Sequence, residues 1–471
     1  MKVVSPPLAI LFVGLLSACT VGPDYVRPEA IEPAAFKYQD GWRTLPAQSW
    51  VASGAWWLAF DDPTLNDLVE RAALANQTLA QAEARYRAAE AQWRFSRGGY
   101  SPQLDATLGA TRSGGSDRAT GENYSARLEI GWAPDLWGRV RRQVEADRAG
   151  LQGSAADLAA ARLNIQAAVA QSYINLRALD RQRDILTETM AAYDRSAALT
   201  RNQYQAGIVS RSDVIQAETQ SQSLRTELYD LENQRALEQN TIAALLGVAP
   251  TQFDLAEQKP LPAVPMLPAT LPSVLIARRP DVVAAERLVA AANARIGVAQ
   301  AAWLPDLTLN VWGGVESGSF SDLFDAPPRV WSVGPVLAQT LFDGGQRRAT
   351  KDMAIARYDE QVAVYRQTVL DSLREVEDAL ATLQILAEKA RQQDALIELA
   401  EENERVATNR YRAGLVSYLE VATAQNLTLS ARRVGVNVTA DRLAATIRLA
   451  ATIGGGWDVD DPVIQSVTDP G

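Results

Sequence analysis

The sequence contains no histidine, a single cysteine and only four methionines among 471 residues. Without histidine or a second cysteine, it lacks disulfides, Cys/His zinc sites, and the Cys-His and Ser-His pairs of nucleophilic catalysis. The same scarcity gives no support to a relay of soft-metal ligands. We therefore expect no enzyme, no metal site and no cofactor.

The sequence also has fewer positive than negative side chains: 46 Lys and Arg against 56 Asp and Glu, which gives a net charge of -10. Nucleic-acid-binding proteins need clustered positive charge to displace counterions, so no nucleic acid partner is expected. After the first 18 residues, no run of 18 apolar residues occurs, and no transmembrane helix is expected. A membrane-spanning element would have to be a β-barrel. Ala, Leu, Gln, Glu and Arg are abundant, which is typical of long packed helices.

The N-terminus has the pattern of a secretory signal peptide over residues 1–18, with Lys2 before a short apolar stretch. The closing tetrad Leu16-Ser17-Ala18-Cys19 resembles the lipobox of bacterial lipoproteins, which implies that Cys19 carries a covalent lipid. In such lipoproteins a residue other than Asp at the next position, here Thr20, usually goes with export to the outer membrane. The alternative is a free buried cysteine.

Two halves of the sequence match each other. Tyr100-Ser101-Pro102-Gln103-Leu104 matches Trp303-Leu304-Pro305-Asp306-Leu307 at an offset of 203 residues, and residues 204–210 match 411–417 at an offset of 207. Such ordered matches at a nearly constant offset indicate a tandem duplication. The predicted organisation is a signal peptide at 1–18, a lipid-anchored segment at 19–60, a first copy at 61–247, a proline-rich linker at 248–272, a second copy at 273–454 and a tail at 455–471.

Each copy is predicted to contain a first helix, two strands, a very long helix and a returning helix. The helices are expected at 65–98, 139–205 and 211–246, and again at 279–303, 346–412 and 418–453. At 1.5 Å per residue, each long helix would span roughly 100 Å. Both long helices have an apolar line at every seventh position, which makes helices supercoil on their neighbours. The lines are Leu151, Leu158, Ile165, Ser172, Leu179, Leu186 and Tyr193, and Ile355, Val362, Val369, Val376, Leu383, Ala390 and Ile397.

The strands show alternating hydrophobicity. Leu104, Ala106 and Leu108 point to one face while Asp105 and Thr107 point to the other, as in a strand with one apolar and one polar face. The loops between paired strands, at 113–123 and 316–329, are rich in Gly, Ser and Asp and are expected in water. Four strands cannot close a barrel, for which about eight is the practical minimum, so the barrel is expected to be shared between subunits.

Aromatic residues at the strand ends suit the two interfaces of a membrane, although packing in a sandwich core is an alternative. These residues are Tyr100, Trp132, Trp137, Trp303, Trp331 and Phe342.

Several motifs together give the sequence a family resemblance: the Pro23-Asp24-Tyr25-Val26-Arg27-Pro28 run after Cys19, the residues 56–63, the run 277–286 that opens with Ala-Arg-Arg-Pro-Asp-Val, and the two Gly-Ile/Leu-Val-Ser turns. The sequence resembles the TolC-like outer-membrane factor family, in particular its lipoprotein branch of drug-efflux channels.

The resemblance covers nearly the whole mature chain and implies a mainly α protein with a membrane β-barrel. It implies a homotrimer in which twelve strands form one outer-membrane barrel and duplicated helical hairpins form a periplasmic α-barrel. It also implies docking, through a periplasmic adaptor protein, onto an inner-membrane pump that is expected to be proton-driven. The chain would be a passive duct through the periplasm and outer-membrane lipid for drugs or other small molecules.

The resemblance places a periplasmic gate at the two helix turns, at positions that correspond to Tyr204, Arg211, Asp213, Tyr411 and Glu420. Acidic side chains facing a narrow pore could form rings that favour cations. Capping is the alternative role, because each carboxylate follows a serine by three residues, the spacing of a capping box. The glycines Gly207 and Gly414 suit the left-handed residue that ends a helix. The family often has Arg in the second turn where Val416 stands here, which weakens the transfer of its closing contacts.

Three other classes of protein fit less well. A carboxylate-only glycan hydrolase needs one asymmetric acid-base pair, not two copies of a turn. A periplasmic adaptor would carry one helical hairpin, and a structural coiled-coil rod would not explain the alternating strands.

Overall fold

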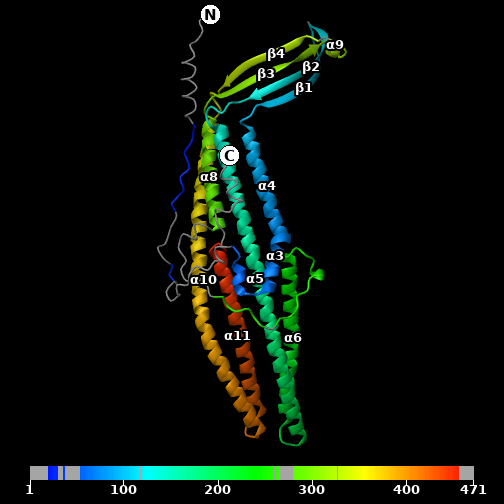
Figure 1. Cartoon of the computed structure of the whole chain (residues 1–471), viewed down its shortest axis with the longest axis vertical. Helices are drawn as coiled ribbons and strands as arrows, with labels where there is room; N and C mark the ends of the chain where they lie inside the picture. Colours follow the sequence, from blue (N-terminus) through cyan, green and yellow to red (C-terminus); the bar gives the residue numbers. More distant parts are fainter. Residues whose placement is uncertain are drawn as a thin grey trace.

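The computed structural model of the chain describes residues 20–29, 36–37, 54–116, 118–258, 260–265, 279–325 and 327–455. The molecule is elongated, with a four-stranded sheet at one end and two helix turns at the other (Figure 1). The predicted lipidation site Cys19 lies outside the described residues, as do the signal peptide and most of the predicted tail. The elements in chain order are η1 (Trp56–Phe60), α3 (Pro63–Ala75), α4 (Gln77–Gly98), β1 (Gln103–Gly115), β2 (Arg118–Trp132), α5 (Arg139–Gln205), α6 (Arg211–Leu245), η2 (Pro250–Gln252), α8 (Pro280–Ala301), β3 (Asp306–Ser317), α9 (Asp322–Asp325), β4 (Arg329–Ala338), α10 (Gln346–Arg412) and α11 (Tyr418–Thr452).

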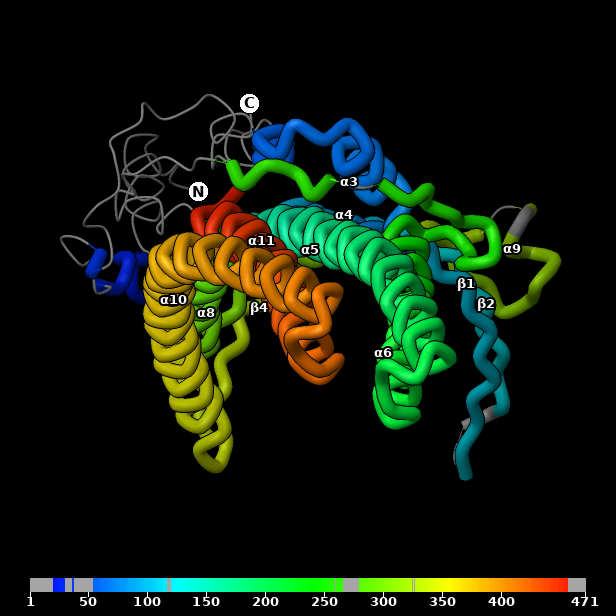
Figure 2. The backbone as a smooth tube through the Cα atoms, turned by 90° about the horizontal axis from the view of Figure 1, so that it is seen from below, coloured from blue at the N-terminus to red at the C-terminus, as the bar shows by residue number. Residues whose placement is uncertain are grey.

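The helices form a curved wall. Near the sheet, α4 packs on α5, α5 on α8 and α8 on α10, whereas near the turns α6 packs on α5, α5 on α11 and α11 on α10. Seen along the long axis, these helices follow an arc, and α3 lies on its convex side (Figure 2). The two copies therefore contribute neighbouring parts of one wall.

The long helices confirm the sequence prediction. α5 and α10 each run for 67 residues over the predicted bounds. Each ends before a glycine with a positive φ, 75° at Gly207 and 74° at Gly414, a conformation that costs glycine little. The returning helices α6 and α11 end one residue before the predicted bounds. In the part of the chain that the structure describes, no helix combines the length and apolarity needed to cross a membrane.

The prediction of one continuous helix over residues 65–98 is wrong, because the chain breaks at Asn76. This residue has extended backbone angles, and its side chain accepts hydrogen bonds from the N–H groups of Thr78 and Leu79. Its Nδ2 also donates to the carbonyl of Leu245 at 2.7 Å. Asn76 thus caps α4 and at the same time fixes the end of α6, which local helix propensity does not reveal.

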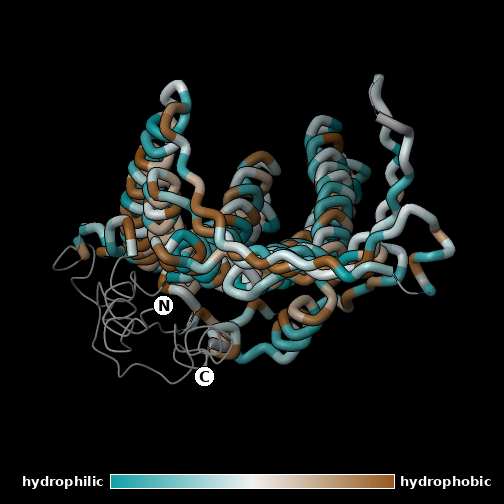
Figure 3. Tube along the Cα trace, turned by 90° about the horizontal axis from the view of Figure 1, so that it is seen from above, coloured by the Kyte–Doolittle hydropathy of each residue, from teal (hydrophilic) through white to brown (hydrophobic). Residues whose placement is uncertain are grey.

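The sheet has the order β1-β2-β3-β4, and every neighbouring pair is antiparallel. The register places most of the apolar side chains of the four strands on one face, with Leu108 opposite Ala126, Ile130 opposite Val311, and Val311 opposite Val333. Trp312, Val330 and Val336 lie on the other face. Hydrophobic residues alternate with polar ones along the strands (Figure 3). The alternation predicted from the sequence is therefore confirmed.

The apolar face of the sheet is exposed in the single chain. Of the six predicted interface aromatics, five are exposed, among them Trp331 at 76% and Phe342 at 88%. The alternative of a sandwich core is wrong, since these side chains are not packed between sheets.

The predicted loop at 113–123 is wrong, because β1 and β2 continue almost to the tip of the hairpin. Arg112 pairs with Glu122 and Ser113 with Gly121 in the ladder. Backbone hydrogen bonds hold this polar extension, and they require no apolar side chains. The second predicted loop is confirmed, with β3 ending at Ser317, β4 beginning at Arg329 and the short α9 between them.

The predicted sevenfold lines mark the core only in part. Leu151, Leu186 and Tyr193 are buried on α5, but on α10 the line is buried only in its middle part, and Ile355 is 37% exposed. Towards the turns the buried positions of α10 are Gln393, Ala400, Ala407 and Tyr411. The step from Leu383 to Gln393 is ten residues, so the seam moves to another side of the helix.

The core at mid-height lies where η1 and α3 cover α5. Trp56, Phe60 and Leu65 are buried there against Tyr173, whose hydroxyl donates to Asp62 at 2.6 Å. Burial, reinforced by this bond, raises the pKa of Tyr173 to about 12. Asp62 also caps α3, so one carboxylate joins the N-terminal elements to the wall.

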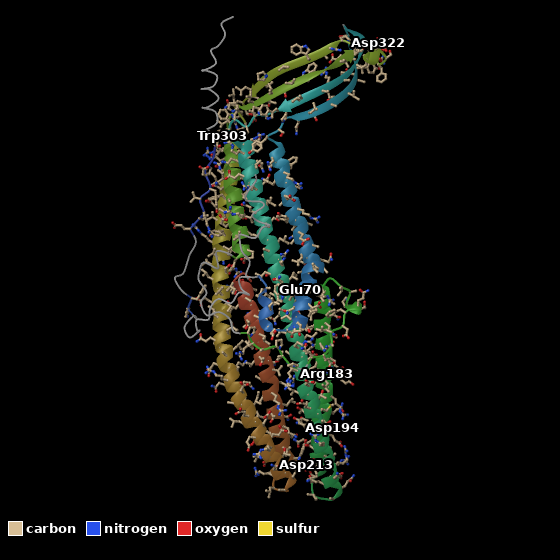
Figure 4. The ribbon with its side chains drawn as sticks, in the orientation of Figure 1. Glu70, Arg183, Asp194, Asp213, Trp303 and Asp322 are labelled. Carbon is tan, nitrogen blue, oxygen red and sulfur yellow. The ribbon has the colours of Figure 1, made fainter. Side chains whose placement is uncertain are left out.

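A buried ionic cluster fastens the proline-rich linker to the wall. Asp180 of α5 pairs with Arg177 at 2.8 Å and with Arg235 of α6 at 2.7 Å. The two arginines also donate to linker carbonyls, at Ala256 and Leu255 respectively. Arg183, labelled in Figure 4, lies on the same stretch of α5. Removing one partner of a buried ion pair is costly. This cluster therefore fixes the position of the linker along the length of the wall.

Candidate functional site

The first helix turn joins α5 to α6 at the end of the molecule distant from the sheet. Gly207 donates its N–H to the carbonyl of Tyr204 at 2.9 Å, and Ile208 donates to that of Gln203 at 2.9 Å. Two orphan carbonyls of α5 are thereby satisfied, as in a glycine-terminated helix. Gly207 therefore has the turn role predicted for it.

Asp213 forms the predicted capping box with Ser210. Its Oδ2 accepts from the Ser210 N–H at 3.0 Å, and the Asp213 N–H donates to the Ser210 Oγ at 3.3 Å. Asp213 lies close to the turn (Figure 4). Burial is the main cause that raises the pKa of Tyr411, and the charge of Asp213 adds to it. The Asp213 carboxylate thus caps α6, while its charge also affects Tyr411 in the second hairpin.

The second turn is built differently, and the capping box that the spacing of Ser417 and Glu420 left open does not form. The side chain of Ser417 makes no capping hydrogen bond. Glu420 instead pairs with Arg410, in the last turn of α10, at 3.5 Å. Glutamate is one methylene longer than aspartate, and here its carboxylate reaches across the turn. Gly414 repeats the role of Gly207, since its N–H donates to the carbonyl of Tyr411 at 2.9 Å.

Tyr411 and Tyr204 occupy equivalent positions but lie in unequal surroundings. Tyr204 is 43% exposed, whereas Tyr411 is 3% exposed and hydrogen-bonds through its hydroxyl to Thr200 at 2.9 Å. Its ring meets that of Tyr418 edge to face, with 5.6 Å between centroids. Tyr411 therefore joins the second hairpin to α5 of the first.

Several residues in this joint were missed from the sequence. Above Tyr411, the Tyr193 hydroxyl donates to Asn426 at 3.3 Å, and Gln425 donates to Ser196 at 3.5 Å. Together with the Thr200 to Tyr411 bond they form a ladder of polar contacts between α5 and the second hairpin. Of these residues, only Tyr193 was marked by a pattern in the sequence, because it lies on the sevenfold apolar line of α5.

Burial keeps the tyrosines of this joint protonated. It raises the pKa of Tyr418 to about 12, and it raises the pKa of Tyr193 and of Tyr411 above the ordinary value near 10. Near neutral pH all three are therefore uncharged hydroxyls, of which Tyr193 and Tyr411 are hydrogen-bonded and Tyr418 has no partner.

The charged side chains near the turns have local contacts. Arg201 of α5 pairs with Glu218 of α6, as Arg410 pairs with Glu420. Arg211 is exposed at the start of α6. The structure thus places all five predicted gate residues at this end of the molecule, but it joins only Tyr411 to the other hairpin by a hydrogen bond. In the described ranges, no group of three or more Cys, Asp or Glu is arranged to hold a metal ion.

A family model described as outer membrane efflux protein matches residues 68–248 and 271–455, which is most of the chain. The chain belongs to the outer membrane efflux protein family. This efflux protein is 31% identical over 456 residues to TtgC of Pseudomonas putida, a probable efflux pump outer membrane protein, with 94% of each covered. It is 29% identical to SilC of Salmonella typhimurium, a probable outer membrane lipoprotein, with 96% of this chain and 98% of SilC covered.

The solved outer-membrane channel OprN has the same fold as this efflux protein. The TM-score is 0.87 at 30% identity, with 93% of this chain and all of OprN covered. These matches confirm the predicted family, fold, outer-membrane location and efflux-channel function. The relatives are named as channel and efflux proteins, which fits the expectation that the chain is not an enzyme.

Proposed function

We propose that three copies of this efflux protein close into one continuous duct. The observation that carries the proposal is the four-stranded sheet, whose edge strands β1 and β4 pair on one side only within the described chain and whose apolar face is exposed. Unpaired strand edges are not tolerated in lipid. Twelve strands from three copies would close a barrel, with the apolar faces toward lipid and the polar faces lining the lumen.

The curved wall supports the same assembly. Three arcs of the kind seen in Figure 2 would enclose a tube below the barrel, with the two turns of each chain at its periplasmic end. In this duct the chain is passive and performs no catalysis. A periplasmic adaptor would dock near the turns, and an inner-membrane, proton-driven pump would supply the energy for export of drugs or other small molecules.

The N-terminal segment supports membrane attachment next to the barrel. Val21 donates its N–H to the carbonyl of Trp137, and Arg141 donates to Thr20 at 2.6 Å, at the start of α5. Cys19 is the preceding residue, so a lipid on Cys19 would enter the membrane close to the barrel wall. In this proposal the lipid anchors each subunit.

The turns would close the duct. The polar ladder between α5 and the second hairpin, with the pair Arg410 and Glu420, would hold the closed state, and Asp213 would add a negative charge near the opening. Tyr204 and Arg211 would face neighbouring subunits.

The closure of three chains is tested by the mass of the detergent-solubilised protein and by conductance in a planar bilayer. We expect about three times the mass of one mature chain, and discrete conductance steps. A monomer of unchanged mass, without conductance, would refute the proposed duct.

The role of the acidic side chains is tested with paired substitutions. Asp213→Asn keeps an acceptor for the Ser210 N–H but removes the charge, whereas Asp213→Ala removes both; Glu420→Gln is the matching change in the second turn. If charge sets ion preference, Asp213→Asn and Asp213→Ala should reduce cation selectivity equally. If capping is the only role, Asp213→Asn should behave as wild type. Loss of drug resistance on deletion would support export.

A further inference from the structure

A groove of about 1410 Å³ lies where the helical wall meets the sheet. All four helices of the upper wall line it: the outer helices α4 and α10 and the inner helices α5 and α8. The strands contribute Gln103, Gly131 and Thr308, which the register places on the polar face of the sheet, and Trp132 at the end of β2, which it places on the apolar face. Most of the strand residues of the groove therefore lie on the face that would line the lumen of the proposed duct.

The N-terminal segment occupies the opposite side of α8. Asn293 donates to the carbonyl of Pro23 at 2.9 Å, and Gly297 lies against Val21. Arg295, which lines the groove, is two residues from each of them. Positions two apart on an α-helix point about 200° apart, so the groove face of α8 is turned away from this segment.

Arginine dominates the charge of the groove. Arg94, Arg139, Arg295 and Arg357 line it, one from each of the four helices, against a single acid, Glu360. This concentration of positive charge occurs in a chain whose net charge is -10. Summed charge in a concave site attracts ions of the opposite sign.

These arginines remain available to a ligand. Arg94 approaches Glu90 only to 4.0 Å, and Arg139 approaches Asp306 only to 3.8 Å, with both arginine side chains more than half exposed. Arg295 is the single exposed residue of the stretch 289–297, which is otherwise buried or half-buried. Within this stretch, α8 is packed on nearly all sides, and its one exposed position, Arg295, lines the groove.

Large apolar side chains lie beside the arginines. Phe95, Trp132, Leu288 and Met353 line the groove and are all exposed. Exposed apolar groups next to guanidinium groups suit a ligand that has an apolar body and a negative charge.

We propose that the groove is a binding site for amphipathic organic anions, which bind through Arg295 and Arg357 and lay their apolar part on Leu288 and Met353. The inference rests on the proposed duct, which places three such grooves around the lumen just below the barrel. The site would concentrate anionic cargo before it enters the barrel.

The test is isothermal titration of the full protein, reconstituted in nanodiscs, with 1-naphthalenesulfonate and with the cation 1-naphthylmethylammonium. The double variant Arg295→Gln/Arg357→Gln is compared with Arg366→Gln, which removes a charge on α10 nine residues from Arg357 and so on its opposite side. We expect the sulfonate to bind, the double variant to weaken its binding about tenfold or more, and Arg366→Gln to leave it unchanged. The ammonium probe should not bind.

Equal binding of both probes, equal binding to wild type and double variant, or no binding to wild type would each overturn the inference. Failure of the duct is recognised separately, by mass and conductance. A protein that conducts as a trimer without arginine-dependent binding refutes only the inference. A monomer that still binds the sulfonate through Arg295 and Arg357 keeps the site and refutes the duct.

Discussion

The hydrogen bond between Thr200 and Tyr411 can be removed by substituting either residue, and the two substitutions should destabilise the protein by different amounts. The Thr200 hydroxyl donates to the carbonyl of Ser196 in its own helix at 2.9 Å. Because that hydrogen is already used, Tyr411 is the donor of the 2.9 Å bond between the hairpins. Both side chains are buried.

The two single substitutions should therefore differ in magnitude. Tyr411→Phe removes one hydrogen bond and leaves the Thr200 donor satisfied, for a cost of about 0.5–1.5 kcal/mol. Thr200→Val leaves the Tyr411 hydroxyl buried without an acceptor, for a cost of about 1–3 kcal/mol. In the double variant no donor is stranded, so its cost should fall near that of Tyr411→Phe, below the sum of the two.

Hydrogen exchange of the amides at the end of α5 and the start of α11 measures these costs as local opening. We expect exchange to accelerate about 2- to 12-fold in Tyr411→Phe and about 5- to 150-fold in Thr200→Val. Thr219→Val is the matched control, because Thr219 bonds to a carbonyl of its own helix and is exposed. If Tyr411→Phe costs as much as Thr200→Val, or if the control has an equal effect, the assigned donor is wrong.

Three further substitutions probe the rest of the molecule. Asp180→Ala leaves Arg177 unpaired in the interior and should cost about 3–5 kcal/mol, seen as a lower melting temperature that Asp180→Ala/Arg177→Met partly restores. Tyr418→Phe removes a buried hydroxyl without a partner and should stabilise the protein by about 1 kcal/mol in denaturation. Since the folded pKa of Tyr418 is about 12 and the unfolded value about 10, the contribution of Tyr418 to stability should be constant below pH 10 and be lost from pH 10 to 12. Over that range the stability of wild type should therefore fall more steeply than that of this variant. Gly22→Ala would bring a Cβ within 2.5 Å of the Gly297 Cα and should release residues 20–29 to protease.

Patterns within a few residues predicted most of the fold. The bounds of α5 and α10 followed from long uninterrupted runs of helix-forming residues that stop at Gly207 and Gly414. The two faces of the sheet followed from alternation, and the extra length of β1 was missed because its last residues lack alternating apolar side chains. The break at Asn76 was missed as well, since an asparagine within a helical pattern becomes a cap only if the fold supports it, here through Leu245.

The candidate site was predicted less completely than the fold. Gly207, Gly414 and the capping box of Asp213 depend on local spacing, and the structure shows each in the expected turn or cap. The partner of Glu420 was not predicted, because a glutamate three residues after a serine can either cap its own helix or reach the preceding one.

The sequence by itself determined the elements that depend on nearby residues: two copies, the lengths of the helices, the alternation of the strands and the places where the chain turns. Local backbone preferences and hydrophobic periodicity are sufficient for these. Tertiary structure alone decided that Tyr411 is buried while its counterpart Tyr204 is exposed. It also brought together arginines from four helices in one groove. Both depend on which helices pack side by side, and that packing joins residues more than a hundred positions apart.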